Sequence, residues 1–327
     1  MKNKIIIVTG CAGMIGYHTV KELIKNFKNY EILGIDDASL FSSDQFQSQR
    51  LSELIKFNNF HFLQCNLNEA QNLHQYISNY NIKGIIHLAA IPGVSQSFYD
   101  PIKTLSNNYT SFLNILEFLR IYKLNIPLLY ASTSSVYGNN ICAKTEENHP
   151  LNPISSYAVS KIQNEQLANL YYDSYKINSI GLRFFTVFGP YNRTDMFIYK
   201  VLDSIKNGTS LSLYNNGNMQ RDFTYVGDVA RVLSTLLTQQ LNNTSLIHDI
   251  FNFGNMSPVS ISYICEYLEE KMGKNGNFQK INSYPSYDPL ITYCDNSKIM
   301  NILNTFDFTP LEMGLDNTAN WFKKINK

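Results

Sequence analysis

The amino-acid sequence predicts an α/β fold with a doubly wound parallel sheet, followed by a smaller α/β domain toward the carboxyl terminus. Two patterns carry this prediction. Short apolar runs alternate with longer segments of helical periodicity up to about residue 183, which is typical of βαβ units. From about Gly189 the elements become shorter, and turn-rich pieces such as residues 215–218 separate them. We therefore expect domains at residues 1–183 and 184–327, with some segments of the second returning to the first.

The first element is an apolar run at residues 4–8, which reads as a strand buried on both faces. A loop with three glycines follows it and leads into a helical stretch at residues 15–27. Gly10 allows a tight turn, Gly13 lets backbone amides approach a pyrophosphate, and Gly16 lets the helix pack closely on the strand. The strand-turn-helix context predicts a dinucleotide site, the alternative being an ordinary glycine turn.

A second short strand, at residues 31–35, ends at Asp36, about 20 residues beyond the glycine loop. An acidic residue at this position accepts hydrogen bonds from a ribose 2′-hydroxyl, whereas its charge repels a 2′-phosphate. The sequence thus favours NAD over NADP as the cofactor. The alternative is that Asp36 and Asp37 are merely solvated.

The remaining elements continue the alternation. We expect strands at residues 60–63, 84–88, 127–132 and 179–183, with helices at residues 69–79, 102–122 and 155–175. In this Rossmann-type arrangement, ligands bind beyond the carboxyl ends of the strands. Small residues at 88–90 follow one such end and leave room for the adenosine or nicotinamide half of a dinucleotide.

Composition excludes several classes of protein. The 327 residues carry a formal net charge of +1 with 16% charged residues, so no basic surface for nucleic acid is expected. No apolar stretch approaches the roughly 20 residues of a membrane span, and we expect a cytoplasmic protein. The five cysteines, at positions 11, 65, 142, 265 and 294, lack metal-ligand spacing and are predicted to be reduced and mostly buried. No metal site is expected.

A Tyr-x-x-x-Lys pair, Tyr157 and Lys161, points to redox chemistry at a sugar carbon. Four residues of spacing place both side chains on one helix face, where the lysine cation would lower the pKa of the phenol. A hydroxyl cluster at residues 132–135 follows a predicted strand and offers donors to the oxygen being oxidised. The alternative is two surface residues on an amphipathic helix.

With these motifs in place, the chain resembles the extended short-chain dehydrogenase/reductase superfamily over nearly its whole length. Within this superfamily the chain resembles the nucleotide-sugar 4-epimerases, and it resembles the UDP-glucuronate 4-epimerases most. The matching runs are residues 8–16, 130–138, 157–161, 181–190 and 219–226. The resemblance implies tightly bound NAD that is regenerated in each cycle, with Tyr157 as the base, Thr133 holding the sugar oxygen and Lys161 gripping the nicotinamide ribose.

The resemblance also implies the other site residues. Besides the three glycines and Asp36, cofactor contacts fall on Met14, Ile15, Asn66, Leu67, Leu88, Ala89, Ala90, Asn108, Tyr157 and Lys161. Substrate contacts fall on Ser134, Ser135, Thr186, Arg193, Arg221 and Asp288. Arg193 would bind a sugar carboxylate and Arg221 the UDP pyrophosphate, the alternative for each being a surface arginine. The same likeness implies a homodimer and a place in surface polysaccharide precursor synthesis.

Substrate identity stays open between related sugars. C4 epimerisation of UDP-glucuronate to UDP-galacturonate through a 4-keto intermediate is favoured. Ser95 departs from this pattern, because the similar uronate epimerases have arginine there, and it admits a UDP-N-acetylhexosaminuronate, UDP-glucose or UDP-N-acetylglucosamine. A uronate decarboxylase and a non-catalytic NAD-binding scaffold are the remaining alternatives. Dehydration is disfavoured, since Ser134 and Ser135 stand where dehydratases carry an Asp-Glu pair.

Overall fold

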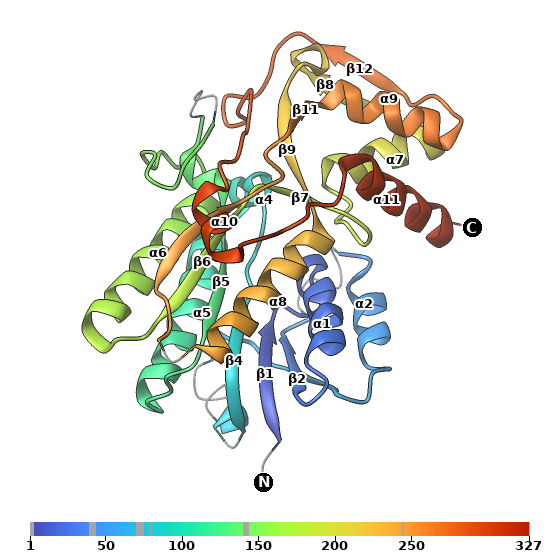
Figure 1. Cartoon of the computed structure of the whole chain (residues 1–327). Helices are drawn as coiled ribbons and strands as arrows, with labels where there is room; N and C mark the ends of the chain where they lie inside the picture. Colours follow the sequence, from blue (N-terminus) through green and yellow to red (C-terminus); the bar gives the residue numbers. More distant parts are fainter. Residues whose placement is uncertain are drawn as a thin grey trace.

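A seven-stranded sheet with only parallel pairs forms the centre of the molecule (Figure 1). The computed structural model describes residues 3–38, 44–69, 75–78, 80–139, 144–243 and 245–326. The strand order is β10-β6-β5-β4-β1-β2-β3. The strands are β1 (Lys4–Thr9), β2 (Glu31–Asp36), β3 (Phe60–Gln64), β4 (Asn81–His87), β5 (Leu128–Thr133), β6 (Ser179–Phe184) and β10 (Asp249–Phe253). Because the order reverses between β1 and β4, the predicted doubly wound fold is confirmed.

Helices cover both faces of this sheet, since alternate side chains of a strand point to opposite sides. On β1, Ile6 and Val8 join the core beneath α1 and α8, whereas Ile5 and Ile7 join the core beneath α5 and α6. Figure 1 shows α1, α2 and α8 on the side facing the viewer. The helix bounds are α1 (Met14–Asn26), α2 (Gln47–Leu54), α5 (Pro101–Ile121), α6 (Ser156–Tyr175) and α8 (Val226–Asn242).

The two helices that cover the far face begin at well-formed caps. The Asp100 side chain accepts a hydrogen bond from the Lys103 amide with Pro101 in the first turn of α5, and Ser155 caps α6 through the Ala158 amide. The predicted helices at 102–122 and 155–175 are therefore confirmed to within one residue. The helix predicted at 69–79 falls largely outside the described residues.

A smaller part lies above the carboxyl ends of the large sheet (Figure 1). It holds a three-stranded sheet, β11-β9-β7, and a two-stranded one, β12-β8. Its strands are β7 (Thr186–Phe188), β8 (Leu211–Tyr214), β9 (Gln220–Tyr225), β11 (Pro258–Ser260) and β12 (Phe278–Ile281), and its helices are α7 (Phe197–Asn207), α9 (Ile261–Met272) and α11 (Leu311–Ile325). The chain leaves this part twice, once for α8 and β10 and again for the short helix α10 (Ser297–Leu303), which packs on β10.

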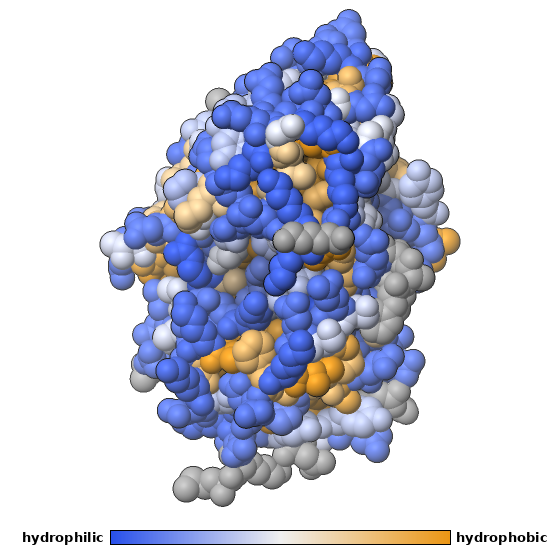
Figure 2. Space-filling view, turned by 90° about the vertical axis from the view of Figure 1, so that its right-hand side faces the viewer, coloured by the Kyte–Doolittle hydropathy of each residue, from blue (hydrophilic) through white to orange (hydrophobic). Residues whose placement is uncertain are grey.

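The face in Figure 2 is mostly hydrophilic, with separate hydrophobic areas. Across the described ranges, no helix has the length and hydropathy that crossing a bilayer requires. Cys11, Cys65, Cys265 and Cys294 are buried free thiols, whereas Cys142 lies outside the described residues.

Candidate active site

A cavity of about 750 Å³ opens between the carboxyl ends of the large sheet and the smaller part. It gathers the predicted site residues from both halves of the sequence. Those that line it are Gly10, Gly13, Met14, Ile15, Gly16, Asp36, Asn66, Leu67, Leu88, Ala89, Ala90, Thr133, Ser134, Ser135, Tyr157, Lys161, Thr186, Arg193, Arg221 and Asp288. A cavity of this size suits a ligand with several rings and charged groups.

The glycine loop forms one end of the cavity. Gly10 has φ +67°, and a Cβ there would lie 2.7 Å from the Ala89 amide nitrogen. A Cβ on Gly16 would overlap the Gly10 carbonyl oxygen. Gly13 is the N-cap of α1 and contributes no side-chain cap, so the first-turn amides remain available to an anion. Only glycine fits this close backbone approach, and the residues present fit the pyrophosphate of NAD.

Asp36 braces the glycine loop from the end of β2. Its carboxylate accepts hydrogen bonds from the amides of Ala12 (3.1 Å) and Ala38 (3.0 Å) and from Gln47 Nε2 (3.1 Å). Burial raises the pKa of Asp36, although the hydrogen bonds from the Ala38 and Ala12 amides act to lower it. The carboxylate therefore holds the loop in shape, and it also lines the cavity.

Asn108 is the predicted cofactor residue that does not line the cavity. It is buried behind the wall, where its Oδ1 accepts from the Ile91 amide (2.7 Å) and its Nδ2 donates to Ile91 O (3.1 Å) and Ser160 Oγ (3.0 Å). Ile91 itself lines the cavity. Asn108 therefore shapes the wall from behind.

The three predicted catalytic side chains meet at the carboxyl end of β5. Thr133 is the last residue of that strand, and its Oγ1 accepts a hydrogen bond from the Ser135 amide at 3.2 Å. Lys161 is buried and donates from Nζ to the Ala131 carbonyl oxygen at 3.0 Å. Its Nζ lies 6.0 Å from the centroid of the Tyr157 ring, one helical turn away. The arrangement places a phenol, a hydroxyl and an ammonium group around one region of the cavity.

The prediction that Lys161 lowers the pKa of Tyr157 is wrong for this structure. Burial raises the pKa of Tyr157, and the groups that oppose this rise are the Arg193 guanidinium and the Thr133 hydroxyl. Burial also lowers the pKa of Lys161 to about 8, partly offset by Glu165. Helical spacing correctly places the pair on one face, but desolvation dominates the pKa of both groups.

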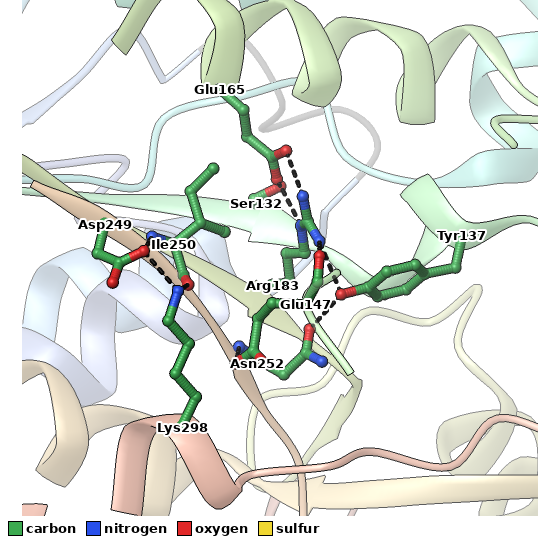
Figure 3. A network of polar contacts seen from close by, with 9 residues as sticks. All are labelled: Ser132, Tyr137, Glu147, Glu165, Arg183, Asp249, Ile250, Asn252 and Lys298. Carbon is green, nitrogen blue, oxygen red and sulfur yellow. Dashed lines mark hydrogen bonds and ion pairs between the residues drawn. The ribbon is translucent and has the colours of Figure 1, made fainter. Parts of the chain in front are cut away.

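A buried polar network lies beneath these residues (Figure 3). Arg183, on β6, donates from Nε and Nη2 to the two carboxylate oxygens of Glu165 at 2.9 and 2.8 Å, and from Nη1 to the Tyr137 hydroxyl at 2.7 Å. Ser132 Oγ donates to the same carboxylate at 2.6 Å, and Tyr137 donates to Asn252 on β10. The network ties β5, β6, β10 and α6 together directly behind Thr133 and Lys161.

Lys161 gives a testable pH dependence of stability. Since its folded pKa of about 8 lies below its ordinary value of 10.5, the folded chain binds fewer protons than the unfolded chain between these pH values. The contribution of Lys161 to stability therefore rises with pH through this window, by about 3 kcal/mol in total. Urea unfolding of nucleotide-free wild type and Lys161→Met between pH 7 and pH 10 measures it. A difference between the two proteins that does not change with pH would contradict a buried, depressed lysine.

Arg193 dominates the opposite wall of the cavity. Its Nε and Nη2 donate to the two oxygens of Asp195 at 2.9 and 2.7 Å, which occupies one edge of the guanidinium group. Its Nη1 has no hydrogen-bond partner among the described residues. Burial works to raise the pKa of Asp195, but the bonds from Arg193 hold it below its usual value. Arg193 Nη2 also donates weakly to Met196 Sδ at 3.8 Å, so Nη1 is the donor that is available to another acceptor.

Gly93, the residue before the short helix that carries Ser95, lies against Arg193. A Cβ on Gly93, which has φ +105°, would lie 3.0 Å from Arg193 Nη2. Ser95, on α4 (Val94–Tyr99), lines the same cavity. A longer basic side chain at position 95 would thus bring a second cation close to Arg193, and serine leaves that space to the ligand.

Arg221 and Asp288 form a pair that spacing did not reveal. Arg221, on β9, donates from Nη2 to Asp288 Oδ1 at 2.5 Å and from Nη1 to the carbonyl oxygen of Gln220 at 2.8 Å. Both side chains line the cavity, as do Ser134, Ser135 and Thr186 from the β5 and β7 ends. The pair closes the end of the cavity formed by the smaller part.

Sequence reasoning missed several residues that line the cavity. Asp44 and Gln47 reach it from the segment around α2, and Asn192 and Asp195 flank Arg193. Spacing from the glycine loop gives no signal for the first two. Asp195 could have been found, because a carboxylate two residues from an arginine is a ready partner for it.

Comparison with known proteins places this site in context. The model of the NAD dependent epimerase/dehydratase family matches residues 6–254. The chain is 34% identical over 319 residues to a UDP-glucuronate 4-epimerase of Thermodesulfobacterium geofontis, covering 97% of this chain and 96% of that protein. It is 32% identical to a Bacillus subtilis protein named as an uncharacterized UDP-glucose epimerase, covering 98% of each.

Among solved structures, the chain is similar to a UDP-glucuronic acid 4-epimerase from Bacillus cereus in complex with UDP-glucuronic acid and NAD. That similarity has a TM-score of 0.86 at 29% identity and covers 98% of this chain and 99% of the other. The similar proteins thus bear the names of both uronate and neutral-sugar epimerases.

Proposed function

Because the chain belongs to the NAD dependent epimerase/dehydratase family and is an NAD-dependent nucleotide-sugar 4-epimerase, we propose that it interconverts UDP-glucuronate and UDP-galacturonate. The observation that carries the choice of a uronate is Arg193. Its guanidinium lines the cavity, acts electrostatically on Tyr157 and keeps Nη1 without a hydrogen-bond partner among the described residues. A carboxylate is the natural bidentate ligand for a guanidinium group.

The proton relay in this proposal uses three side chains. Tyr157, as the phenolate, takes the proton of the sugar 4-hydroxyl, while Thr133 hydrogen-bonds the same oxygen. Lys161, fixed by its bond to the Ala131 carbonyl, keeps a positive charge near the phenol. Bound NAD would supply a hydride acceptor for C4 and then a hydride donor to the opposite face of the 4-keto sugar, and Tyr157 would return the proton to the C4 oxygen. Gly10, Gly13, Asp36 and the residues after β4 would hold the cofactor.

Inversion requires the 4-keto sugar to turn over while its UDP group stays fixed. Arg221 is proposed to hold the pyrophosphate, with Asp288 orienting its guanidinium through the 2.5 Å bond. Ser134, Ser135 and Thr186 offer hydroxyls to either orientation of the sugar. We propose that residues 1–183 mainly serve the cofactor and residues 184–327 mainly the UDP-sugar.

Asp195 sets the direction in which Arg193 can bind. The carboxylate occupies the edge formed by Nε and Nη2, so a substrate carboxylate would bind at Nη1 and displace the weak contact between Nη2 and Met196 Sδ. A 4-keto uronate is a β-keto acid that loses carbon dioxide readily. Arg193 is proposed to hold the substrate carboxylate in an orientation that disfavours this loss.

A second candidate substrate rests on Ser95. Serine in this wall leaves space beside Gly93 and Arg193 that a bulkier sugar could fill. An N-acetylated uronate meets both conditions, because it has a carboxylate for Arg193 and an additional group for that space. UDP-glucose and UDP-N-acetylglucosamine lack the carboxylate.

The deciding experiment uses purified protein without added cofactor. It is incubated separately with UDP-glucuronate, UDP-N-acetylglucosaminuronate, UDP-glucose and UDP-N-acetylglucosamine, and the H1 and H4 proton signals are followed. Conversion of UDP-glucuronate to its galacto epimer, in preference to the neutral sugars, is expected. Turnover of neutral sugars alone would overturn the uronate proposal and leave the epimerase activity intact.

We further propose that two chains pair through α5 and α6. Apolar side chains on these helices, among them Ile102, Tyr109 and Leu170, are exposed in the single chain. Burial of this surface would stabilise a homodimer. Sedimentation over a range of concentrations tests the proposal, and a chain that remains monomeric at every concentration would refute it.

A further inference from the structure

Arg50 is a fully buried arginine that the reaction does not use. It lies on α2 with no exposed surface, and its guanidinium contacts three separate segments. It donates from Nε to the Ala12 carbonyl oxygen at 2.6 Å and from Nη1 to the Tyr191 carbonyl oxygen at 3.1 Å, and Nη2 pairs with Asp44. A buried arginine with all its donor groups directed at specific acceptors fixes their relative positions.

The first of these contacts belongs to the cofactor end of the cavity. Ala12 lies inside the glycine loop, between Gly10 and Gly13. Its carbonyl accepts from Arg50 while its amide donates to Asp36, so the peptide groups on both sides of this residue are held. The positive charge of Arg50 also counteracts the rise that burial causes in the pKa of Asp36.

The second contact belongs to the sugar end. Tyr191 has φ +63°, a left-handed conformation that is uncommon for a residue with a side chain. Such a conformation persists where the surroundings determine it, and here Arg50 holds the carbonyl while Glu53 accepts from the hydroxyl. Asn192 follows, and its Oδ1 accepts from the Arg193 amide at 3.0 Å. The position of Arg193 therefore depends on the backbone that Arg50 fixes.

The third contact makes the arrangement sensitive to charge. Asp44 is buried with Arg50, and it also acts electrostatically on Arg193. Removal of Arg50 alone would leave an unpaired buried carboxylate beside the cavity. A neutral pair at positions 44 and 50 avoids this unpaired charge, and it removes the two carbonyl contacts together with the effect of Asp44 on Arg193.

We propose that Arg50 is a positioning residue that couples the glycine loop to the loop carrying Arg193, so that cofactor retention and sugar binding depend on one buried side chain. The inference goes beyond the proposed function. It requires that Arg193 contact the sugar but not that the sugar be a uronate.

Two neighbours of Arg50 provide matched controls, because each contacts one end of the cavity. Among the described residues, Gln47 donates a hydrogen bond to Asp36 and forms none with the Tyr191 loop. Glu53 accepts from the hydroxyls of Tyr17 and Tyr191 and, in the described part of the chain, forms no hydrogen bond with the glycine loop. Gln47→Leu should therefore weaken only NAD retention, and Glu53→Gln only sugar binding.

The test compares Arg50→Lys, Arg50→Met/Asp44→Asn, Gln47→Leu and Glu53→Gln with wild type. NAD per chain is measured after extensive dialysis, and KM is measured with saturating NAD for whichever UDP-sugar the wild type epimerises fastest. Hydrogen bonds from a charged donor lead us to expect an approximately ten-fold or greater change in both quantities for the double variant. Arg50→Lys keeps the charge but not the planar guanidinium group. We therefore expect smaller changes in NAD content and in KM than in the double variant.

The outcomes separate clearly. A folded double variant that changes only one of the two quantities, or neither, overturns the coupling. If the double variant does not fold, as judged by circular dichroism, Arg50→Lys decides by the same criterion. The inference is supported if the Arg50 variants lose both NAD retention and sugar affinity while each control loses only one of them. This criterion holds whichever sugar is the substrate.

Discussion

Tyr157→Phe is expected to lower kcat for C4 epimerisation by about 10³-fold while NAD stays bound. A positioned acid–base group contributes roughly 10²–10⁴-fold, and this substitution removes only the oxygen that exchanges the proton. The phenyl ring keeps its place between Thr133 and Arg193, so the cavity should keep its shape. Turnover followed by NMR, together with the NAD content of the purified variant, measures both effects.

Tyr130→Phe is the matched control for this result. Tyr130 is a buried tyrosine on the same strand as Thr133, and its hydroxyl has no hydrogen-bond partner among the residues that the structure describes. Its loss should leave kcat within a few-fold of wild type. Should Tyr157→Phe retain more than a tenth of wild-type kcat, another group would have to accept the proton.

Arg193→Met is expected to lower kcat/KM for UDP-glucuronate about 100-fold and to leave a neutral UDP-sugar little changed. The loss corresponds to a charge-assisted bidentate bond whose acceptor then stays unpaired in the cavity. The same variant should release a pentose product, because nothing then restrains the carboxylate of the 4-keto sugar. Asp195→Asn keeps the Arg193 cation but weakens the two hydrogen bonds that orient its guanidinium. We expect a smaller loss of kcat/KM for UDP-glucuronate, of about ten-fold.

Arg120→Met controls for the loss of a paired arginine elsewhere. Arg120 donates from Nε and Nη2 to both oxygens of Glu117 at 2.8 and 2.7 Å, the same geometry as Arg193 with Asp195, and it does not line the cavity. The Arg120→Met variant should leave kcat/KM unchanged for every sugar. An Arg193→Met variant that discriminates between sugars as wild type does would refute the carboxylate assignment.

The sheet and the glycine loop were predictable because their signals are local. A strand buried on both faces reads as a continuous apolar run, and Gly10 and Gly16 stand where any side chain would collide with backbone. Asp36 follows from its distance along the chain to the glycine loop. Once the sheet topology is predicted, the residues that follow the strands can be placed together at their carboxyl ends.

Contacts between distant segments were not predictable in this way. Arg50 reaches across 141 positions to Tyr191, and Arg221 across 67 to Asp288. The periodicity of apolar residues in the sequence does not predict such pairs. The pKa of Tyr157 was predicted wrongly for a related reason, since helical spacing reports neighbours on the helix but not the desolvation that the rest of the fold imposes.

The path of the chain between the two parts bears on how this enzyme could acquire new specificity. After β9 the chain descends to form α8, then β10 at the edge of the large sheet, before rising again to β11 and α9. The segments proposed to contact the sugar are therefore interleaved with segments that complete the core of the large sheet. A single recombination crossover could not exchange one sugar pocket for another without also replacing α8 and β10. Divergence in such a scaffold would proceed by point changes in short loops, such as those around Ser95 and Arg193.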